Sequence, residues 1–320
     1  FRPARETGIR RVRLMRVAFF GTPEFAVPSF RALLEEGFEV AVAVTQPDRP
    51  HGRSRSQLVA PPVKQAALEE EIPVLQPDRP EGAFADDLGA FQTDLGVVVA
   101  YGHILKPEIL AIPRLGMLNL HASILPQLRG AAPIAWSILN GDETTGVSVM
   151  QMEAALDSGP VLHQIKTEVA SDETAGELSQ RLSELGAAAL VEGLTLLEAG
   201  EIRPRPQDHT RASYAPKVSR TLARLDWSRD GATLARAVRA FDPEPGAWAI
   251  LGEHEMKLFG GRVSNTGGEP GTILEAGRSL VIATAVGALE VTEVQPSGKR
   301  RMPVAEWLRG RGAATGQRFT

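Results

Sequence analysis

The sequence of 320 residues contains no cysteine. Disulfide bonds and zinc or iron–sulfur sites with thiolate ligands are therefore excluded, and the absence fits the reducing cytoplasm, where we expect the protein to act. Long apolar runs are absent too, since a membrane span needs ~20 consecutive apolar residues. The longest run, LGVVVAYGHIL at 95–105, is typical of a buried strand. We therefore expect a soluble protein with no membrane attachment.

The signatures of two common enzyme classes are also missing. The first strand and its turn, VAFFGTPEF, occupy the position of a dinucleotide-binding fingerprint but contain the single glycine Gly21. A pyrophosphate site needs further glycines for close backbone approach, so nicotinamide and flavin binding are disfavoured. No G-x-S-x-G nucleophile elbow occurs in the chain, which argues against a serine hydrolase of the α/β-hydrolase type.

From Met15 onward, short apolar runs alternate with helical stretches, which predicts an α/β fold with a doubly wound, mostly parallel, Rossmann-like sheet. A chain of this length exceeds the ~250 to 300 residues at which single cores stop growing, so we expect a second domain. The expected strands lie at 16–21, 39–46, 95–102, 116–123, 146–152 and 160–168, and the expected helices at 24–36, 62–71, 81–92, 131–140 and 174–199.

Composition divides the chain into four parts. Residues 1–14 carry five Arg against one Glu and show no apolar periodicity, so we expect a disordered or artefactual extension, with a basic nucleic-acid-binding arm as the alternative. Residues 15–203 form the predicted catalytic domain. Pro204 and Pro206 indicate an extended linker at 204–216. Residues 217–320, with a helix at 231–241 and strands within 247–262, 270–284 and 287–296, predict a smaller OB-like β-barrel.

Charge is unevenly distributed between these parts. Residues 1–205 hold 19 Lys and Arg against 27 Asp and Glu, whereas residues 206–320 hold 16 against 12. A basic C-terminal third suggests a polyanionic partner, with an ordinary solvated surface as the alternative.

The stretch NLHASILPQLRGAAPIAW at 119–136 places Asn119, His121 and Ser123 at alternate positions. In a strand such residues share one face, here at the carboxyl end, where open α/β sheets bind ligands. An amide can donate to an oxyanion, and an imidazole can hold or transfer a proton. Alternate strand residues lie about 6.6 Å apart, which is awkward for a Ser–His hydrogen bond and disfavours a Ser–His–Asp hydrolase. The alternative is a buried polar strand end whose His121 is satisfied by the backbone.

Asp157, in LDSGPVL at 156–162, lies in a turn from which its carboxylate could reach the end of a neighbouring strand, although it could equally be a surface residue. Asn, His and Asp without a nucleophile suit an acyl transfer in which the substrate brings its own amine. An α-amine has a pKa near ~8, so a modest base suffices and no metal is needed.

These motifs resemble those of the folate-dependent formyltransferases, which pair an N-x-H-x-S-[LI]-L-P strand with a downstream L-D-x-G. The segments FFGTPEFAVPSF, TQPDRPHGR, VVVAYGHIL, RGAAPI and TGVSVMQM extend the resemblance over nearly the whole chain from Met15. They narrow it to members of the family that act on initiator tRNA. The resemblance implies transfer of the formyl group of 10-formyltetrahydrofolate to the α-amine of methionyl initiator tRNA. We expect a monomer without a metal.

The resemblance also implies roles for individual residues. Asn119 would hold the formyl oxygen, and His121 and Asp157 would handle the proton of the amine, with the working base left open between them. The residues implied to line or border the folate cleft are Ser123, Ile124, Leu125, Pro126, Tyr101 and Gly102.

In the family, the loop corresponding to residues 45–64 contacts the tRNA acceptor stem. Its arginines here, Arg49, Arg53 and Arg55, supply charge suited to phosphates, with a plain surface loop as the alternative for Arg55. The densest basic cluster of the C-terminal domain, SGKRRMP, supplies Lys299, Arg300 and Arg301, for which surface solubility is the alternative to phosphate binding.

Two alternatives to the tRNA substrate stay open. The first is formyl transfer to a small amine, such as a sugar nucleotide or glycinamide ribonucleotide, toward which DSGP at 157–160 leans slightly. The second is a catalytically silent RNA-binding protein on the same scaffold. The Arg-bearing loop and basic barrel argue against the first, and the intact Asn119, His121 and Asp157 argue against the second.

Overall fold

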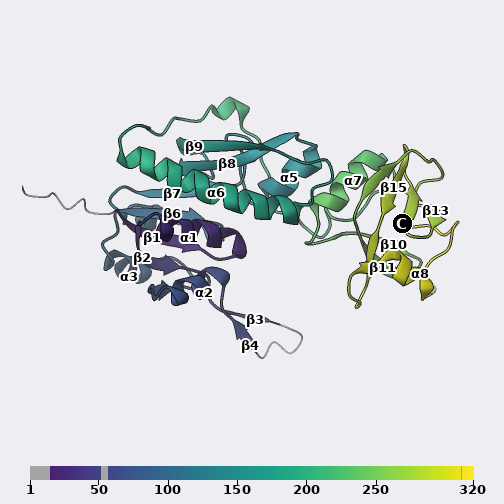
Figure 1. Ribbon diagram of the computed structural model, residues 1–320, viewed down its shortest axis with the longest axis horizontal. Coiled ribbons are helices and arrows are strands. Elements are labelled where there is room, and N and C mark those ends of the chain that lie inside the picture. The colour runs from purple at the N-terminus through teal and green to yellow at the C-terminus, as the bar shows by residue number, and fades with distance from the viewer. Residues whose placement is uncertain (1–14, 52–56, 311) are drawn as a thin grey trace, which may run out of the picture.

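A computed structural model of the chain describes residues 15–51, 57–310 and 312–320. It has an α/β lobe and a smaller, mostly β lobe, joined where helices of the two lobes pack together (Figure 1). No helix in the described part of the chain is long and apolar enough to cross a membrane.

The α/β lobe is built on a seven-stranded sheet with the order β5-β2-β1-β6-β7-β8-β9. Its five parallel strands are β1 (Arg16–Gly21), β2 (Glu39–Val44), β5 (Val74–Leu75), β6 (Leu95–Val99) and β7 (Met117–His121). Two antiparallel strands, β8 (Thr144–Gln151) and β9 (Val161–Glu168), complete one side. The predicted doubly wound, mostly parallel sheet is confirmed.

Helices cover both faces of this sheet. The larger hydrophobic cluster lies under α1 (Val27–Glu35), α2 (Pro62–Glu69), α5 (Pro133–Asn140) and α6 (Ala175–Glu198), and the smaller one under α3 (Phe84–Gly89) and α4 (Pro107–Leu110). A short 3₁₀ turn at Glu24–Ala26 precedes α1. The long helix α6 begins with Thr174 as its N-cap, in a capping box with Glu177.

The β lobe begins with α7 (Gly231–Ala240) and contains two antiparallel sheets. One has the order β10-β11-β16-β17 and the other β12-β15-β14-β13. Their strands are β10 (Ala247–Leu251), β11 (His254–Phe259), β12 (Arg262–Ser264), β13 (Ile273–Ala276), β14 (Leu280–Ala283), β15 (Ala288–Val291), β16 (Glu293–Pro296) and β17 (Met302–Pro303), followed by α8 (Val304–Arg309).

The C-terminal tail bridges these two sheets. Thr320 exchanges two backbone hydrogen bonds with Ile250 of β10, and Ile273 of β13 donates to the Gln317 carbonyl. The tail therefore links the two antiparallel sheets into one small β domain, which agrees with the smaller β-barrel domain predicted for residues 217–320.

Two parts of the chain differ from the expected elements. Residues 49–59, predicted as loop, include a hairpin of β3 (Arg49–His51) and β4 (Gln57–Val59) that projects from the α/β lobe (Figure 1). The strand expected at 116–123 ends at His121, so the expectation that Ser123 follows the strand alternation is wrong. Ser123 lies in a turn instead, where its hydroxyl donates to the Gln127 carbonyl.

Candidate active site

Strand β7 presents Asn119 and His121 on one face of the sheet. Leu118 and Leu120 belong to the larger hydrophobic cluster and Met117 to the smaller one, so the alternate residues point toward the second face. Asn119 is half-buried, and its side-chain amide has no hydrogen-bond partner among the described residues. The amide is therefore available to donate to a bound ligand.

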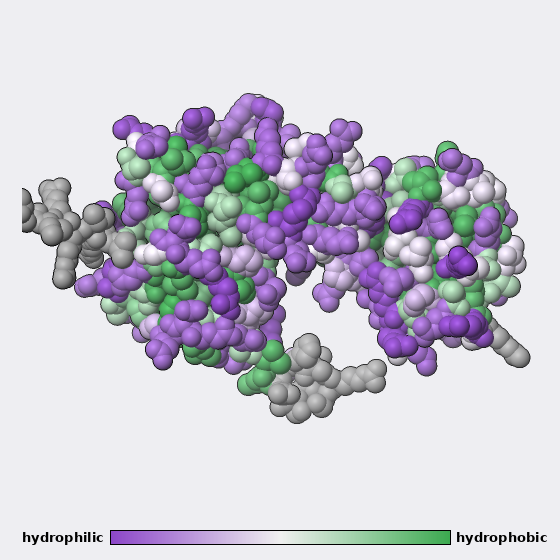
Figure 2. Space-filling model, viewed as in Figure 1, coloured by the Kyte–Doolittle hydropathy of each residue, from purple (hydrophilic) through white to green (hydrophobic). Residues whose placement is uncertain are grey.

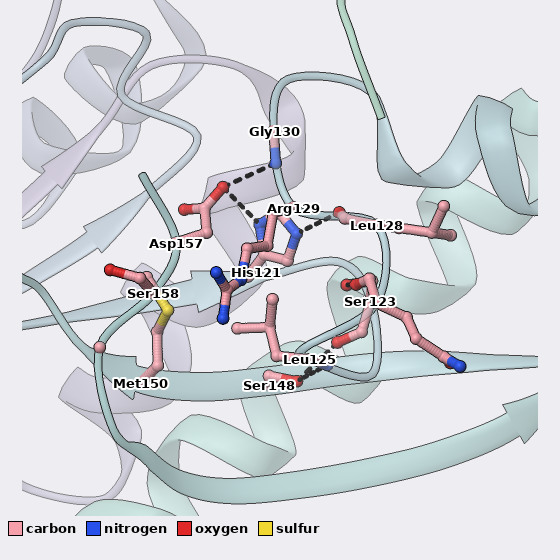
Figure 3. A network of polar contacts seen from close by, with 12 residues as sticks. His121, Ser123, Leu125, Leu128, Arg129, Gly130, Ser148, Met150, Asp157 and Ser158 are labelled. Atoms are coloured by element: carbon pink, nitrogen blue, oxygen red, sulfur yellow. Dashed lines mark hydrogen bonds and ion pairs between the residues drawn. The ribbon is translucent and has the colours of Figure 1, made fainter. Parts of the chain in front are cut away.

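His121 is 6% exposed and held by the backbone at one ring nitrogen. Its Nε2 lies 2.9 Å from the carbonyl oxygen of Leu128. Because a carbonyl oxygen can only accept, this contact assigns the hydrogen to Nε2. The other nitrogen, Nδ1, lies 3.8 Å from Oδ2 of Asp157 (Figure 3). Backbone satisfaction thus accounts for only one side of the ring, and the other faces a carboxylate.

Asp157 reaches His121 from the loop between β8 and β9. Its own backbone is left-handed, with φ of +47°, a conformation that costs energy in a residue other than glycine. Oδ2 accepts a hydrogen bond of 2.8 Å from the backbone N–H of Gly130 (Figure 3). Gly130 has φ of +115°, and a Cβ there would lie 2.8 Å from the Ala215 carbonyl oxygen, so only glycine fits. The structure therefore brings Asp157 and His121 together around one glycine.

The segment predicted to line the folate cleft is fixed by the side chain of Ser148. Its hydroxyl donates to the Ser123 carbonyl (2.6 Å) and accepts from the Leu125 N–H (3.1 Å) and from Gln164 Nε2 (2.7 Å). Gln164 also donates to the Leu125 carbonyl (3.0 Å). Since the Ser123 hydroxyl is itself bonded to the backbone, the side chains of this segment that keep part of their surface accessible are those of Ile124 and Pro126.

Of the two residues predicted to border the cleft, Tyr101 is buried and Gly102 is exposed. The Tyr101 ring is 1% exposed, packs edge-on against Phe20 with 5.4 Å between ring centroids, and has its pKa raised to about 12 by burial. Its carbonyl accepts from Thr22 Oγ1 and Gln46 Nε2, both at 3.0 Å. A contact between Tyr101 and a ligand would therefore involve its backbone.

Two buried residues of the site were missed by the sequence reasoning. Arg129 is 4% exposed and donates through Nη2 to Gln207 Oε1 (2.6 Å) and His209 Nδ1 (2.9 Å). Gln207 lies in the predicted linker and donates to the carbonyls of Asp157 (2.9 Å) and Gly159 (2.7 Å). Arg129 lies within the stretch NLHASILPQLRGAAPIAW that carries Asn119 and His121, so its position in the sequence could have marked it as a candidate site residue. Gln207 carries no local signal, because its partners lie far away in the sequence.

Two protein-family models match the chain: Formyl transferase at residues 15–194, and Formyl transferase, C-terminal domain, at residues 217–312. The chain is 45% identical over 299 residues to the methionyl-tRNA formyltransferase of Pseudomonas paraeruginosa, covering 93% of this chain and 96% of that one. For the Stutzerimonas stutzeri enzyme the identity is 46% over 288 residues, or 89% and 91% of the two chains. The chain belongs to the methionyl-tRNA formyltransferase family.

The fold agrees with this membership. The solved methionyl-tRNA formyltransferase of Clostridium thermocellum superposes with a TM-score of 0.55 over 80% of this chain and 96% of that chain, at 15% identity. The resemblance found in the sequence motifs is confirmed, and so is the prediction of an α/β domain followed by a smaller β domain, whose sheets are antiparallel.

The structure describes only one of the three arginines expected to contact tRNA from the segment 45–64. Arg49 is exposed on the β3–β4 hairpin and donates to the side chain of Gln46, while Arg53 and Arg55 lie outside the described residues. The hairpin is anchored at Asp48, whose pKa is lowered by hydrogen bonds from Lys64 and then Gln76. Figure 2 shows an open notch between the two lobes.

The basic cluster of the β lobe is partly neutralised. Arg301 donates to Asp242 (2.7 Å) and Glu293 (2.5 Å), and its guanidinium lies 4.0 Å from the ring centroid of Phe259. Arg300 is highly exposed and pairs with one carboxylate at 3.1 Å, and Lys299 is exposed. The cluster therefore offers accessible charge chiefly at Lys299 and Arg300. No group of three His, Asp or Glu in the described ranges is arranged to hold a metal ion.

Proposed function

We propose that this protein transfers the formyl group of 10-formyltetrahydrofolate to the α-amine of methionyl initiator tRNA, and that it does so in the cytoplasm. The observation that carries this proposal is the convergence of a free amide, Asn119, with the paired His121 and Asp157 at the end of a central strand. Membership of the methionyl-tRNA formyltransferase family supports the choice of both substrates.

The reaction begins when the amine attacks the formyl carbon and a C–N bond forms. Negative charge then develops on the formyl oxygen, and Asn119 is the donor placed to stabilise it. In comparable oxyanion sites one such donor contributes about 3 kcal/mol to transition-state stability. The intermediate collapses when the bond from carbon to the N10 nitrogen of the folate breaks, which releases tetrahydrofolate and the formylated amine.

The proton of the amine passes through the His121–Asp157 pair. Because Nε2 of His121 donates to the Leu128 carbonyl, Nδ1 is the ring nitrogen able to take a proton, and it faces the Asp157 carboxylate. The pair accepts the proton as the amine attacks and returns it to N10 as that nitrogen leaves. Proton balance is thus kept without a metal or a covalent enzyme intermediate.

The folate and tRNA contacts complete the proposal. Residues 123–126, fixed by Ser148, form one wall of the folate cleft, and Tyr101 and Gly102 border it. We propose that phosphates of the tRNA contact Arg49, Arg53 and Arg55 of the segment 45–64 and Lys299, Arg300 and Arg301 of the β lobe. Among the described residues of this set, Arg49, Lys299 and Arg300 offer the most accessible charge. We further propose that the protein is a monomer with a catalytic domain at 15–203, a linker at 204–216 and a tRNA-binding β-barrel domain at 217–320.

The test is transfer of labelled formyl to charged initiator tRNA, run beside uncharged initiator tRNA, charged elongator tRNA and free methionine. We expect label on charged initiator tRNA alone, and a kcat about 10²- to 10³-fold lower for Asn119→Ala. Asn265→Ala, at an exposed position of the β lobe, is the matched control with unchanged kcat.

Three outcomes would contradict the proposal. Transfer to sugar nucleotides or glycinamide ribonucleotide instead of tRNA would make this a small-amine formyltransferase. Binding of tRNA without any transfer would indicate a silent RNA-binding protein. An unchanged kcat in Asn119→Ala would remove the amide from the mechanism.

A further inference from the structure

The segment that joins the two lobes contributes a buried side chain to the active site. Gln207 is 8% exposed, and its amide contacts the backbone of the loop that carries Asp157. We propose that Gln207 is a positioning residue for Asp157, so that the linker completes the catalytic geometry. This inference rests on the proposed role of Asp157 in proton transfer.

The orientation of the Gln207 amide is determined by its partners. Oε1 accepts from Nε (3.2 Å) and Nη2 (2.6 Å) of Arg129, and Nε2 donates to the carbonyls of Asp157 (2.9 Å) and Gly159 (2.7 Å). A guanidinium can only donate and a carbonyl can only accept, so a flipped amide would break all four contacts. Both donors and both acceptor sites of the amide are in use.

These contacts close a ring around the catalytic pair. The Asp157 carboxylate accepts from the Gly130 N–H, Gly130 follows Arg129 in the chain, and the Arg129 side chain returns through Gln207 to the Asp157 backbone. The residue before Arg129, Leu128, accepts from His121. The ring therefore sets the separation of the carboxylate from the imidazole, and it restrains the left-handed backbone of Asp157.

The same linker also binds the backbone of the loop that follows His121. The Leu128 N–H donates to the Ser213 hydroxyl and the Arg129 N–H to the Ser213 carbonyl, both at 2.9 Å, while the Ala215 N–H donates to the Arg129 carbonyl at 2.7 Å. Residues 207–215 thus lie across the loop that follows His121, whose Leu128 and Gly130 contact His121 and Asp157. The geometry of the site depends on a segment that leads directly into the β lobe.

The test uses Gln207→Glu in the full-length protein. The second carboxylate oxygen would face the carbonyls of Asp157 and Gly159 and repel them, while the contact with Arg129 is kept. We expect kcat to fall by about 10- to 100-fold, since a displacement near 1 Å is enough for such a loss, with KM for the tRNA and the folate unchanged. Gln180→Glu, exposed on α6, is the matched control and should behave as wild type.

The double variant Gln207→Glu with Asp157→Asn separates positioning from a general structural effect. If Gln207 acts through Asp157, the double variant is no slower than Asp157→Asn alone; losses that multiply would overturn the inference. Should Gln207→Glu fail to fold, Gln207→Met keeps the length, removes all four hydrogen bonds and takes its place in the same cycle. If both Gln207 variants keep the wild-type kcat while Asp157→Asn is inactive, this inference is wrong and the proposed function stands. If Asp157→Asn is active, or if the wild-type protein does not formylate methionyl-tRNA, the proposed function is wrong.

Discussion

Replacing Ser148 by alanine should loosen the predicted folate wall, and the size of the effect follows from its hydrogen bonds. Ser148 is fully buried, and its hydroxyl makes three bonds, to Leu125 N–H, Gln164 Nε2 and the Ser123 carbonyl. In Ser148→Ala, Gln164 keeps the Leu125 carbonyl as a partner, but the Leu125 N–H loses its acceptor. A buried donor left unpaired costs about 1 to 3 kcal/mol, so we expect the free energy of unfolding to fall by about 2 kcal/mol.

Ser183→Ala in α6 is the matched control. Ser183 is also buried, and its hydroxyl donates to the Gln180 carbonyl one turn earlier at 2.7 Å. This carbonyl also belongs to the helix ladder, so its loss orphans no group, and we expect a change within about 0.5 kcal/mol.

Urea denaturation measures both effects. With a slope of about 2 to 3 kcal/mol per molar urea, 2 kcal/mol lowers the midpoint of Ser148→Ala by roughly 1 M, while that of Ser183→Ala stays near wild type. KM for 10-formyltetrahydrofolate should rise in Ser148→Ala alone. Equal midpoints would refute the reasoning about the network, and a lowered midpoint with unchanged KM would refute residues 123–126 as the folate wall.

Three further changes test other parts of the structure. Tyr101→Phe removes a buried hydroxyl that has no hydrogen-bond partner among the described residues. Thermal denaturation should therefore show a free energy of unfolding that is unchanged or higher by up to about 1 to 3 kcal/mol, and KM for the folate should be unchanged. A raised KM would show that the hydroxyl contacts the ligand. Gly130→Ala places a methyl group against the Ala215 carbonyl at φ of +115°. The free energy of unfolding measured in urea should fall by about 1 to 3 kcal/mol, and kcat should fall as well. Wild-type values of both would contradict the left-handed geometry of Gly130. The pKa of Glu177 is lowered by the Thr174 backbone N–H and then its hydroxyl, so this carboxylate stabilises the fold above its unfolded pKa near ~4.3 and loses that contribution as pH falls through its folded pKa. Urea midpoints at pH 7 and pH 3 should therefore differ more in wild type than in Glu177→Gln, and an equal difference would contradict the capping box.

Local pattern in the sequence was sufficient for much of the fold. Alternating strands and helices predicted the α/β sheet, and the placement of Asn119 and His121 on one face follows from the period of a strand. The long helix predicted at 174–199 is found at Ala175–Glu198 with Thr174 as its N-cap, because helical periodicity and capping depend on neighbours within a few residues. The motifs around Asn119 and Asp157 carried the family resemblance, while the roles of individual residues stay predictions.

Tertiary structure decided how those residues meet. No local rule places Asp157 beside His121 or sets their 3.8 Å separation. Gln207 and Arg129 are 78 positions apart, and their pairing turned a segment that composition marks only as a linker into part of the site. In the same way, Arg301 is bound by Glu293, eight positions away on the paired strand β16, and by Asp242, 59 positions away. The run of three basic residues in the sequence does not reveal either contact. Periodicity and capping act over a few residues and are written in the sequence, whereas buried polar partners are brought together only when the chain has folded, and it is these partners that fix the site.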